Sequence, residues 1–347
     1  RRQERMAAAS DDEYADDFET DDPEAAPRPA APEAAAAASA RSSAAAPASR
    51  ADDGFAEVPI EEIEIGKKLG GGGFAVVFLA RWRGKQVAAK VLVDPKISDE
   101  LRTEFLNELR VMKSLHHPGI VRCVAACSTP PRMAFVMELC GDSLFSVLHT
   151  PAECHWRGAA KRIPEAQTVR WATGVAEAIA FLHAQSPRIV HRDLKSHNLL
   201  LAADGRLKLC DFGLVHHPEP GAGTPQYMAP ELLAGARSGF SDRVDVFAFG
   251  VLLWEMLARR VPYAGWRQED IVSGVQAGER PPMSDIAEGR ASPALRALIQ
   301  RCWDGDATKR PSMADVVAEL RRWRPASSAV ASATRKRGGD ALDALMH

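Results

Sequence analysis

The sequence has little of what marks several large classes of protein. Its 347 residues include only 6 cysteines, too few for a disulfide scaffold of this size and typical of a reducing compartment. No apolar run approaches the roughly 18 residues that a membrane span needs. Lys and Arg number 44 against 46 Asp and Glu, so the chain lacks the large positive charge of a histone-like protein. We therefore expect a soluble, cytoplasmic protein with no membrane span and no nucleic-acid partner.

Both ends of the chain are poor in the residues that a folded core requires. Residues 1–55 combine an acidic run between Asp11 and Asp22 with an Ala-, Pro- and Ser-rich stretch, and they contain no branched apolar residue. Residues 326–347 are again rich in Ser and Ala, with a small basic cluster at Arg335–Arg337. Such segments bury too little apolar surface to offset the entropy of ordering them. We expect disordered termini around one folded region, residues 56–325.

Within the folded region the pattern changes once, near residue 141. Before it, short apolar runs separated by turns predict strands, at Ile63–Ile65, Val76–Leu79, Val87–Val93, Val121–Ala126 and Met133–Met137. After it, long periodic segments such as Thr168–His183 and Val244–Leu257 predict helices. This order predicts an α+β protein with a sheet-rich first lobe (56–140), a larger helical second lobe (141–325) and a cleft between them.

A glycine-rich stretch, Gly70–Gly73, lies between two of the predicted strands and is followed by Phe74. Glycine lets backbone N–H groups approach a phosphate closely because no side chain intervenes. A flexible hairpin turn explains the same residues equally well when they are taken alone. A Rossmann loop is excluded because a strand rather than a helix follows. A Walker loop is excluded because no Gly-Lys-Ser/Thr sequence closes the stretch.

Lys90 lies in the middle of a predicted apolar strand, and a lysine is almost never buried without a partner. Helical spacing over Asp99–Leu115 places Leu101, Phe105, Glu108 and Met112 on one face. A carboxylate on an apolar stripe requires a cation, so we predict that Glu108 pairs with Lys90. The alternative is that Glu108 lies at the solvent edge of the stripe.

The densest group of reactive side chains lies in two short segments, His191–Asn198 and Lys208–Gly213. Asn198 and Asp211 offer the hard oxygen ligands that Mg²⁺ prefers. Asp193 has the chemistry to orient an attacking hydroxyl, and Lys195 to neutralise charge on a moving phosphoryl group. Together these residues predict a phosphoryl-transfer site.

In this order, the motifs resemble those of the eukaryotic protein kinases, from about Ile60 to Trp323. The resemblance implies a bilobal kinase fold that uses ATP and Mg²⁺ to phosphorylate Ser or Thr of a protein substrate. The Lys195–Asn198 run and the Gly-Thr-Pro before Tyr227 are similar to serine/threonine kinases. Asp245–Gly250 and the Cys302–Pro311 ending resemble the tyrosine-kinase-like group, which includes the Raf-like and mixed-lineage kinases. A dual-specificity kinase and a catalytically silent kinase-like scaffold remain the alternatives.

The resemblance also implies roles for individual residues. Asp193 matches the catalytic base, Asn198 and Asp211 the metal ligands, and Lys90 the residue that holds the α- and β-phosphates and pairs with Glu108. Lys195 matches a further catalytic residue. The matching nucleotide-binding set is Leu69, Gly70, Gly72, Phe74, Val77, Ala88, Lys90, Met137, Glu138, Cys140 and Leu200. The resemblance further pairs Glu231 with Arg310 and makes Asp245 the anchor of the catalytic loop.

The sequence departs from the family pattern at two places. Ala75 replaces the third glycine of the loop, which is tolerable if its φ is negative. The segment between Gly213 and Gly223 contains no Ser, Thr or Tyr, although kinases are often activated by a phosphate there. We expect Thr224 to hold the catalytic loop, and the enzyme to need no phosphate in this segment. Residues that would replace the phosphate are Glu219, or His216 and His217.

Overall fold

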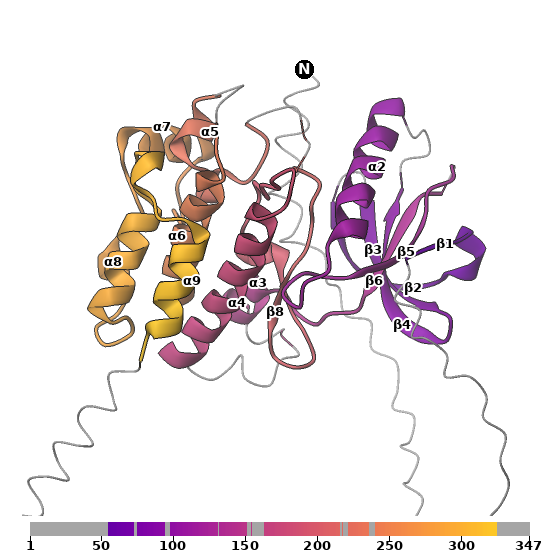
Figure 1. Cartoon of the computed structure of the whole chain (residues 1–347), viewed down its shortest axis with the longest axis horizontal. Coiled ribbons are helices and arrows are strands. Elements are labelled where there is room, and N and C mark those ends of the chain that lie inside the picture. The colour runs from indigo at the N-terminus through magenta and orange to yellow at the C-terminus, as the bar shows by residue number, and fades with distance from the viewer. Residues whose placement is uncertain are drawn as a thin grey trace, which may run out of the picture.

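The computed structural model places the chain in two lobes that meet near residue 140 (Figure 1). It describes residues 55–72, 75–93, 98–130, 132–150, 154, 163–215, 217, 221–235 and 240–324. The two termini that we expect to be disordered lie outside these residues except for Phe55, which packs against the core, so the described chain begins one residue before the predicted boundary of the folded region. Phe74, His216 and Glu219 also lie outside the described residues. None of the helices in the described ranges is both long enough and apolar enough to cross a membrane.

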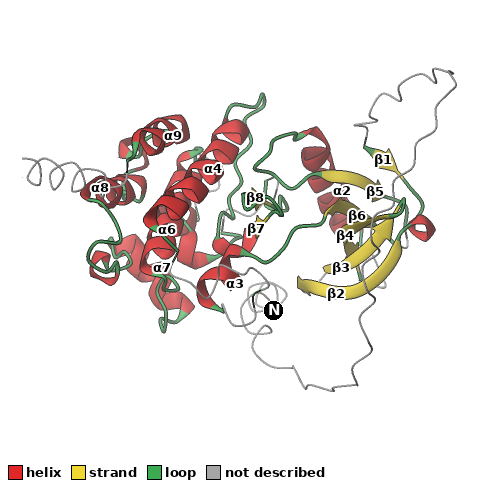
Figure 2. Ribbon diagram, turned by 90° about the horizontal axis from the view of Figure 1, so that it is seen from below, coloured by secondary structure: helices red, strands yellow, loops and turns green. Residues whose placement is uncertain are grey.

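The first lobe is a six-stranded sheet with one helix packed against it (Figure 2). The strand order is β1-β5-β6-β4-β3-β2, and all neighbours are antiparallel except β1, which runs parallel to β5. The strands are β1 (Ala56–Glu57), β2 (Glu64–Gly72), β3 (Ala75–Trp82), β4 (Lys85–Leu92), β5 (Cys123–Cys127) and β6 (Ala134–Glu138).

The start of the helix of this lobe, α2 (Asp99–Ser114), has clear local reasons. The Ser98 side chain accepts a hydrogen bond from the Leu101 N–H, and two acidic residues in the first turn favour the positive end of the helix dipole. Phe105, Glu108, Leu109, Val111 and Met112 are buried. The helix therefore turns its apolar stripe, together with one carboxylate, towards the sheet.

The second lobe is built around α6 (Arg243–Ala258), in which every residue from Val244 to Leu257 is buried. A helix that is apolar on all sides belongs in the centre of a helical lobe. The helices α4 (Glu165–His183), α8 (Pro293–Cys302) and α9 (Met313–Arg322) pack around this region (Figure 2). The other helices of this lobe are α3 (Leu144–His149), α5 (Pro230–Leu233) and α7 (Gln268–Ala277).

A two-stranded hairpin, β7 (Leu199–Leu201) and β8 (Leu207–Leu209), lies where the second lobe meets the first (Figure 2). Leu209 connects it to the segment before β5, because its N–H donates to the Gly119 carbonyl and its carbonyl accepts from the Val121 N–H, each over 2.8 Å. The hairpin therefore holds the predicted catalytic segments, which precede and follow it, beside the sheet.

The predicted α+β class and two-lobe arrangement are confirmed, but some strand bounds differ. The predicted strand Val121–Ala126 is observed as Cys123–Cys127. Ile63 ends a 3-10 turn at Ile60–Glu62, and β2 begins only at Glu64. The strand then continues through the glycines, where Gly70 pairs with Val77 and Gly72 with Ala75. Gly70–Gly72 are thus part of a strand pair, which side-chain periodicity could not predict because glycine has no side chain.

Candidate active site

Lys90 and Glu108 form the ion pair that the helical spacing predicts. Lys90 Nζ lies 3.0 Å from Glu108 Oε1 and 3.3 Å from Oε2. The same ammonium group lies 3.4 Å from Asp211 Oδ1. One cation from β4 therefore joins a carboxylate on α2 to a carboxylate that follows β8, and so connects the two lobes.

The charges of these three groups are strongly coupled. Burial by itself would lower the pKa of Lys90, but the carboxylates of Asp211 and Glu108 outweigh it and leave that pKa raised. The Lys90 charge lowers the pKa of Asp211 to about 2. Burial raises the pKa of Glu108, and the charge of Asp211 adds to that effect while Lys90 opposes it. The lysine thus stays charged, and Asp211 is an anion at neutral pH.

Strand register places a small apolar surface beside Lys90. Val77 is paired with Lys90, and Ala88 lies two residues before Lys90 on the same strand. Paired residues share a face of a sheet and alternate residues return to it, so Val77, Ala88 and Lys90 face the same side. Val77 is half-buried and Ala88 is buried, whereas Leu69 on β2 is 51% exposed. This face has the apolar character that an adenine ring needs, with the lysine at one end.

The glycine stretch contains a position that the sequence analysis did not single out. Gly71 has a φ of 153°, and a Cβ there would come within 2.7 Å of the Val76 Cα. Only glycine fits this close approach of two backbones. Its neighbours Gly70 and Gly72 lie in β2, and Ala75 pairs with Gly72 as an ordinary strand residue. Phe74, which we predict to cover the phosphates, lies outside the described residues.

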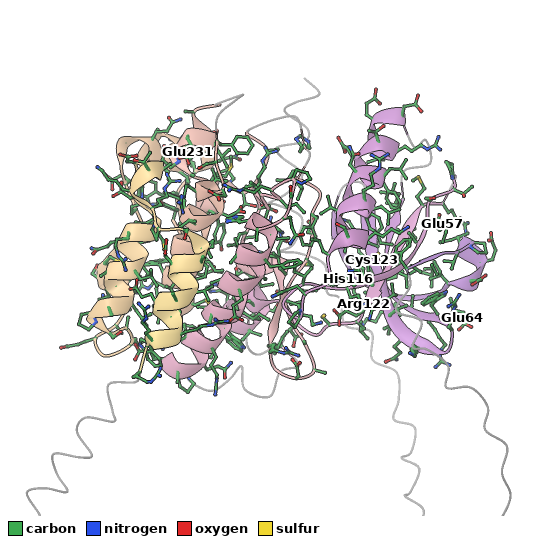
Figure 3. The ribbon with its side chains drawn as sticks, in the orientation of Figure 1. Glu57, Glu64, His116, Arg122, Cys123 and Glu231 are labelled. Atoms are coloured by element: carbon green, nitrogen blue, oxygen red, sulfur yellow. The ribbon has the colours of Figure 1, made fainter. Side chains whose placement is uncertain are left out.

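The connection between the lobes carries Met137, Glu138 and Cys140. Met137 is buried and Cys140 half-buried. The Glu138 N–H donates to the Arg122 carbonyl over 3.0 Å. Its side chain accepts from the Arg122 N–H over 2.8 Å and from Lys208 Nζ over 2.6 Å. Arg122, which lies where the two lobes meet (Figure 3), and β8 therefore hold this connection in place.

Asp193, Lys195 and Thr224 form one hydrogen-bonded unit. The Thr224 hydroxyl donates to Asp193 Oδ1 over 2.9 Å and accepts from Lys195 Nζ over 2.7 Å. Lys195 Nζ also lies 3.1 Å from Asp193 Oδ2. The structure therefore places Thr224 against the catalytic loop, as the sequence analysis expects. The unit fixes the Asp193 carboxylate and keeps a positive charge beside it.

Asn198 and Asp211 lie just before and just after the β7–β8 hairpin, and the Cys210 N–H donates to the Asn198 carbonyl over 2.9 Å. The Asn198 amide nitrogen donates to the backbone carbonyl and to Oδ2 of Asp193, each over 2.9 Å. This leaves the amide oxygen of Asn198 as the atom that could hold a metal ion. Asp211 Oδ1 faces Lys90 and the Gly213 N–H. Two hard oxygen donors near a lysine have the chemistry to hold a divalent cation.

Asp245, at the start of α6, anchors the catalytic loop. Its side chain is fully buried. It accepts hydrogen bonds from the backbone N–H groups of His191 and Arg192 over 2.9 and 2.8 Å, and its Oδ2 contacts His183 Nε2 at 2.8 Å. Burial by itself would raise the pKa of Asp245, but these hydrogen bonds, led by that of His183, leave it lowered. The helix at the centre of the lobe therefore fixes the loop that carries Asp193.

A second buried acid on α6, Glu255, has a similar role that the sequence analysis missed. It is fully buried and accepts from the Ser196 hydroxyl over 2.7 Å and from the Tyr227 hydroxyl over 2.8 Å. His149 Nε2 lies 2.9 Å from the same carboxylate. Glu255 thus ties the catalytic loop to the Tyr227 segment and to α3. The only sequence signal was a second acid inside an apolar helix, which does not indicate the partners of that acid.

The segment after Asp211 is held by two arginines. Arg192 Nη1 donates to the backbone carbonyls of Leu214 and His217 over 3.0 and 2.7 Å. Arg310, which is almost fully buried, forms a bidentate pair with Glu231 over 2.7 and 2.9 Å, as the sequence analysis expects. Two backbone carbonyls of this segment therefore accept hydrogen bonds from Nη1 of Arg192.

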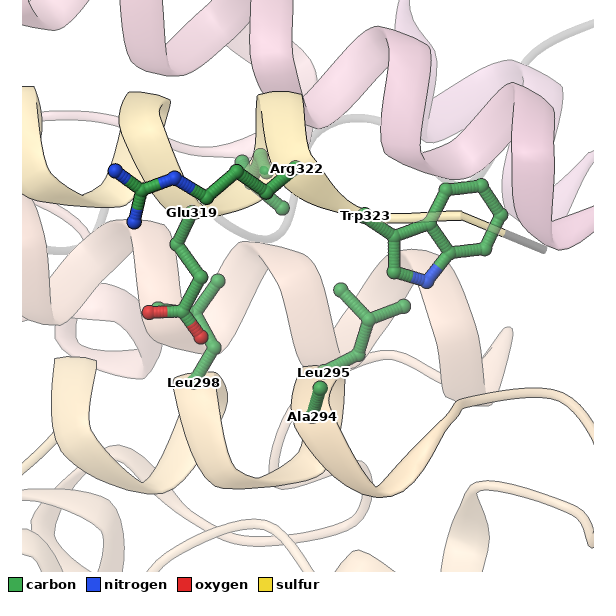
Figure 4. A pocket seen from close by; sticks show the side chains of 7 residues that line it. Ala294, Leu295, Leu298, Glu319, Arg322 and Trp323 are labelled. Atoms are coloured by element: carbon green, nitrogen blue, oxygen red, sulfur yellow. The ribbon is translucent and has the colours of Figure 1, made fainter. Parts of the chain in front are cut away.

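A shallow apolar hollow of about 180 Å³ lies elsewhere, between α8 and α9 (Figure 4). Leu295 and Leu298 form its floor, and Trp323 and Glu319 stand over it. It contains none of the reactive residues described above, so we assign the active site to the meeting point of the two lobes.

Comparison of the sequence with known proteins identifies the family. The sequence model of the protein kinase domain matches residues 63–320. The chain is 36% identical over 273 residues to the serine/threonine-protein kinase CTR1 of Arabidopsis thaliana, covering 76% of this chain and 32% of that protein. It is 37% identical over 272 residues to mitogen-activated protein kinase kinase kinase 7 of Bos taurus, covering 76% and 44%. It therefore spans less than half the length of these relatives. The family prediction is confirmed, and the chain belongs to the protein kinase domain family.

Proposed function

We propose that this protein is a serine/threonine protein kinase that transfers the γ-phosphate of MgATP to hydroxyl groups of protein substrates. The observation that carries the proposal is the Asp193–Lys195–Thr224 unit, which presents an oriented carboxylate with a cation beside it. The relatives named as serine/threonine kinases support the same residue class. They also support the likeness to Raf-like and mixed-lineage kinases, and with it a role in signal transduction.

The reaction breaks the bond between the γ-phosphorus and the oxygen that bridges it to the β-phosphate. It forms a bond from that phosphorus to a substrate Ser or Thr oxygen, with ADP as the leaving group. Asp193 orients the hydroxyl and receives its proton, which then passes to solvent. Lys195 neutralises charge that develops on the transferring group, so catalysis is mainly positioning and electrostatic stabilisation.

Nucleotide binding falls to residues of both lobes. Lys90, oriented by Glu108, would hold the α- and β-phosphates, while Gly70 and Gly72 would cover them. Leu69, Val77, Ala88 and Leu200 would enclose the adenine ring. Met137 would lie behind the ring, and the backbone of Glu138 and Cys140 would bind its edge.

Asn198 and Asp211 would hold Mg²⁺, which supplies charge neutralisation for the phosphates. No group of three or more His, Cys, Asp and Glu side chains in the described ranges suits a metal by itself. Two protein ligands fit Mg²⁺, because this ion usually takes its remaining ligands from phosphates and water.

The presence of Lys90, Asp193, Asn198 and Asp211 disfavours a silent scaffold, because loss of any of them would remove a required step. All six cysteines are free thiols, which supports a reducing, cytoplasmic location. The proposed partners are ATP and a protein that offers Ser or Thr.

The test is phosphate transfer from MgATP by the purified full chain, to itself and to a generic basic protein. Asp211→Asn is the matched variant, because it keeps the shape of the side chain and removes the charge. We expect phosphoserine or phosphothreonine from the wild type and at least a hundredfold less from the variant. Equal incorporation by both proteins, or none by the wild type, would overturn the proposal.

A further inference from the structure

The first described residues of the chain lie along the edge of the sheet, beside the helix that carries Glu108. Strand β1 pairs with β5 in parallel, with Ala56 opposite Ala125 and Glu57 opposite Ala126. The Val58 N–H continues the ladder to the Ala126 carbonyl over 2.9 Å. Glu57 marks this outer edge of the lobe (Figure 3). The segment is therefore an added edge strand with a fixed register.

A side-chain contact fixes this strand beyond the end of β5. Glu57 Oε1 accepts from the Ser128 N–H over 2.8 Å and also from the Ser128 hydroxyl. Hydrogen bonds to a charged carboxylate are stronger than those between neutral groups. The strand is thus held at its second residue by both its backbone and its side chain.

Successive residues of this strand face opposite sides of the sheet. Ala56 and Val58 pack into the small apolar cluster on the outer face, which includes Val87 and Val136. Phe55 instead packs against the large core cluster, which includes Phe105 and Met112 of α2. The short stretch from Phe55 to Val58 therefore contacts both faces of the sheet, and Phe55, just before β1, makes the contact on the side of α2.

Phe55 contacts the last turn of α2. Lys113 Nζ lies 4.7 Å from the centre of the Phe55 ring, within the range of a cation–π interaction. Lys113 follows Glu108 by five residues, so about 7.5 Å of helix separates them. Because a helix moves as a rigid element, a contact that fixes its final turn also limits the position of Glu108. Glu108 in turn lies 3.0 Å from Lys90.

We propose that Phe55 is a positioning residue for the active site. Held by β1, its ring fixes the carboxyl end of α2 against the sheet and so keeps Glu108 in contact with Lys90. This assignment rests on the proposed kinase activity, because its effect is on the rate of phosphate transfer. Phe55, immediately before β1, thereby supports the catalytic ion pair.

The experiment compares Phe55→Ala, Phe55→Tyr and Val58→Ala in the full chain. Val58→Ala is the matched control, since it removes apolar packing on the face away from α2 and keeps the backbone hydrogen bonds that hold β1. Rates of phosphate transfer to a generic basic protein are measured over a range of MgATP concentrations, alongside thermal unfolding.

We expect Phe55→Ala to lower kcat about fivefold, the effect of one lost ring–cation contact. The kcat of Phe55→Tyr stays within about twofold of the wild-type value, because this variant keeps the aromatic ring. Val58→Ala lowers the Tm by about 5 °C and leaves kcat unchanged.

Three results would overturn the assignment. An unchanged kcat in Phe55→Ala would show that the ring does not position α2. Equal losses of kcat and Tm in Phe55→Ala and Val58→Ala would show a purely structural role. A wild-type chain that transfers no phosphate would instead overturn the proposed function, and this assignment with it.

Discussion

Thr224 donates its hydroxyl hydrogen to Asp193 Oδ1 over 2.9 Å, and this bond fixes the orientation of the carboxylate that we propose receives the substrate proton. Thr224→Val keeps the size of the side chain and removes both its donor and its acceptor. We expect kcat to fall between about tenfold and a hundredfold, because misorientation of a catalytic group carries a cost of that size. Thr224→Ser, which keeps the hydroxyl, should remain within about threefold of the wild type.

Initial rates at saturating MgATP test this prediction, and thermal unfolding checks that both variants fold. A Thr224→Val protein as active as Thr224→Ser would show that the hydrogen bond does not matter to the reaction.

Asp245→Asn should destabilise the whole second lobe. The wild-type carboxylate is fully buried and accepts from His191 N–H, Arg192 N–H and His183. An amide turns one acceptor into a donor that faces a donor, so the free energy of unfolding should fall by about 3 kcal/mol. Asp270→Asn is the control, because its exposed pair with Arg267 contributes little. Chemical denaturation measures both variants, and equal small effects would contradict the anchoring role.

His197 should make stability depend on pH between about 6.5 and 4. In the folded chain the pKa of His197 falls from 6.5 to about 4, because its ring is desolvated where it stacks on Phe145 and because Lys195 adds a nearby positive charge, although the side chain keeps contact with solvent. The unfolded chain therefore binds more protons in this range. The contribution of His197 is complete above pH 6.5 and is lost as the pH falls through about 4.

His197→Asn should therefore lose less stability than the wild type on acidification from pH 7 to 4. His116→Asn, at another exposed position outside the catalytic loop, is the control. The melting temperatures of the three proteins are measured over this pH range. Identical dependence of the melting temperature on pH for the wild type and His197→Asn would contradict the lowered pKa of His197.

Activity should not require a phosphate on the segment between Gly213 and Gly223. Arg192 already donates to the carbonyls of Leu214 and His217, and the segment carries no hydroxyl side chain. Phosphatase treatment of the purified chain should leave its initial rate within about twofold, because no phosphate-dependent contact is lost. Loss of activity together with loss of phosphate from Thr224 would refute this expectation.

The sequence predicts contacts best where periodicity or spacing carries them. The pairing of Lys90 with Glu108 follows from one carboxylate on an apolar helix stripe and one lysine in an apolar strand. The two-lobe arrangement follows from the change in period near residue 141. The links of Asp245 and Arg310 to their partners agree with the family resemblance, which supplied information that spacing alone does not contain.

Contacts that depend on the folded backbone cannot be predicted from periodicity or spacing in the sequence. A two-residue strand such as β1 has no period to detect, so its pairing with β5 and the contact of Phe55 with Lys113 gave no signal. Glu255 lies in a helix that is apolar on every side, so no face indicated its partners. The requirement for Gly71 arises from the close approach of two strands, which only the structure shows.

The most direct test of the account is the rate of phosphate transfer by Asp193→Asn relative to the wild type, at a MgATP concentration that saturates both. The substitution keeps the shape of the side chain and removes the atom that accepts the proton. We expect a loss of at least about a hundredfold, while MgATP still raises the Tm of the variant, because the nucleotide contacts lie elsewhere. An Asp193→Asn protein that transfers phosphate at the wild-type rate would contradict the proposed role of Asp193 and the mechanism built on it.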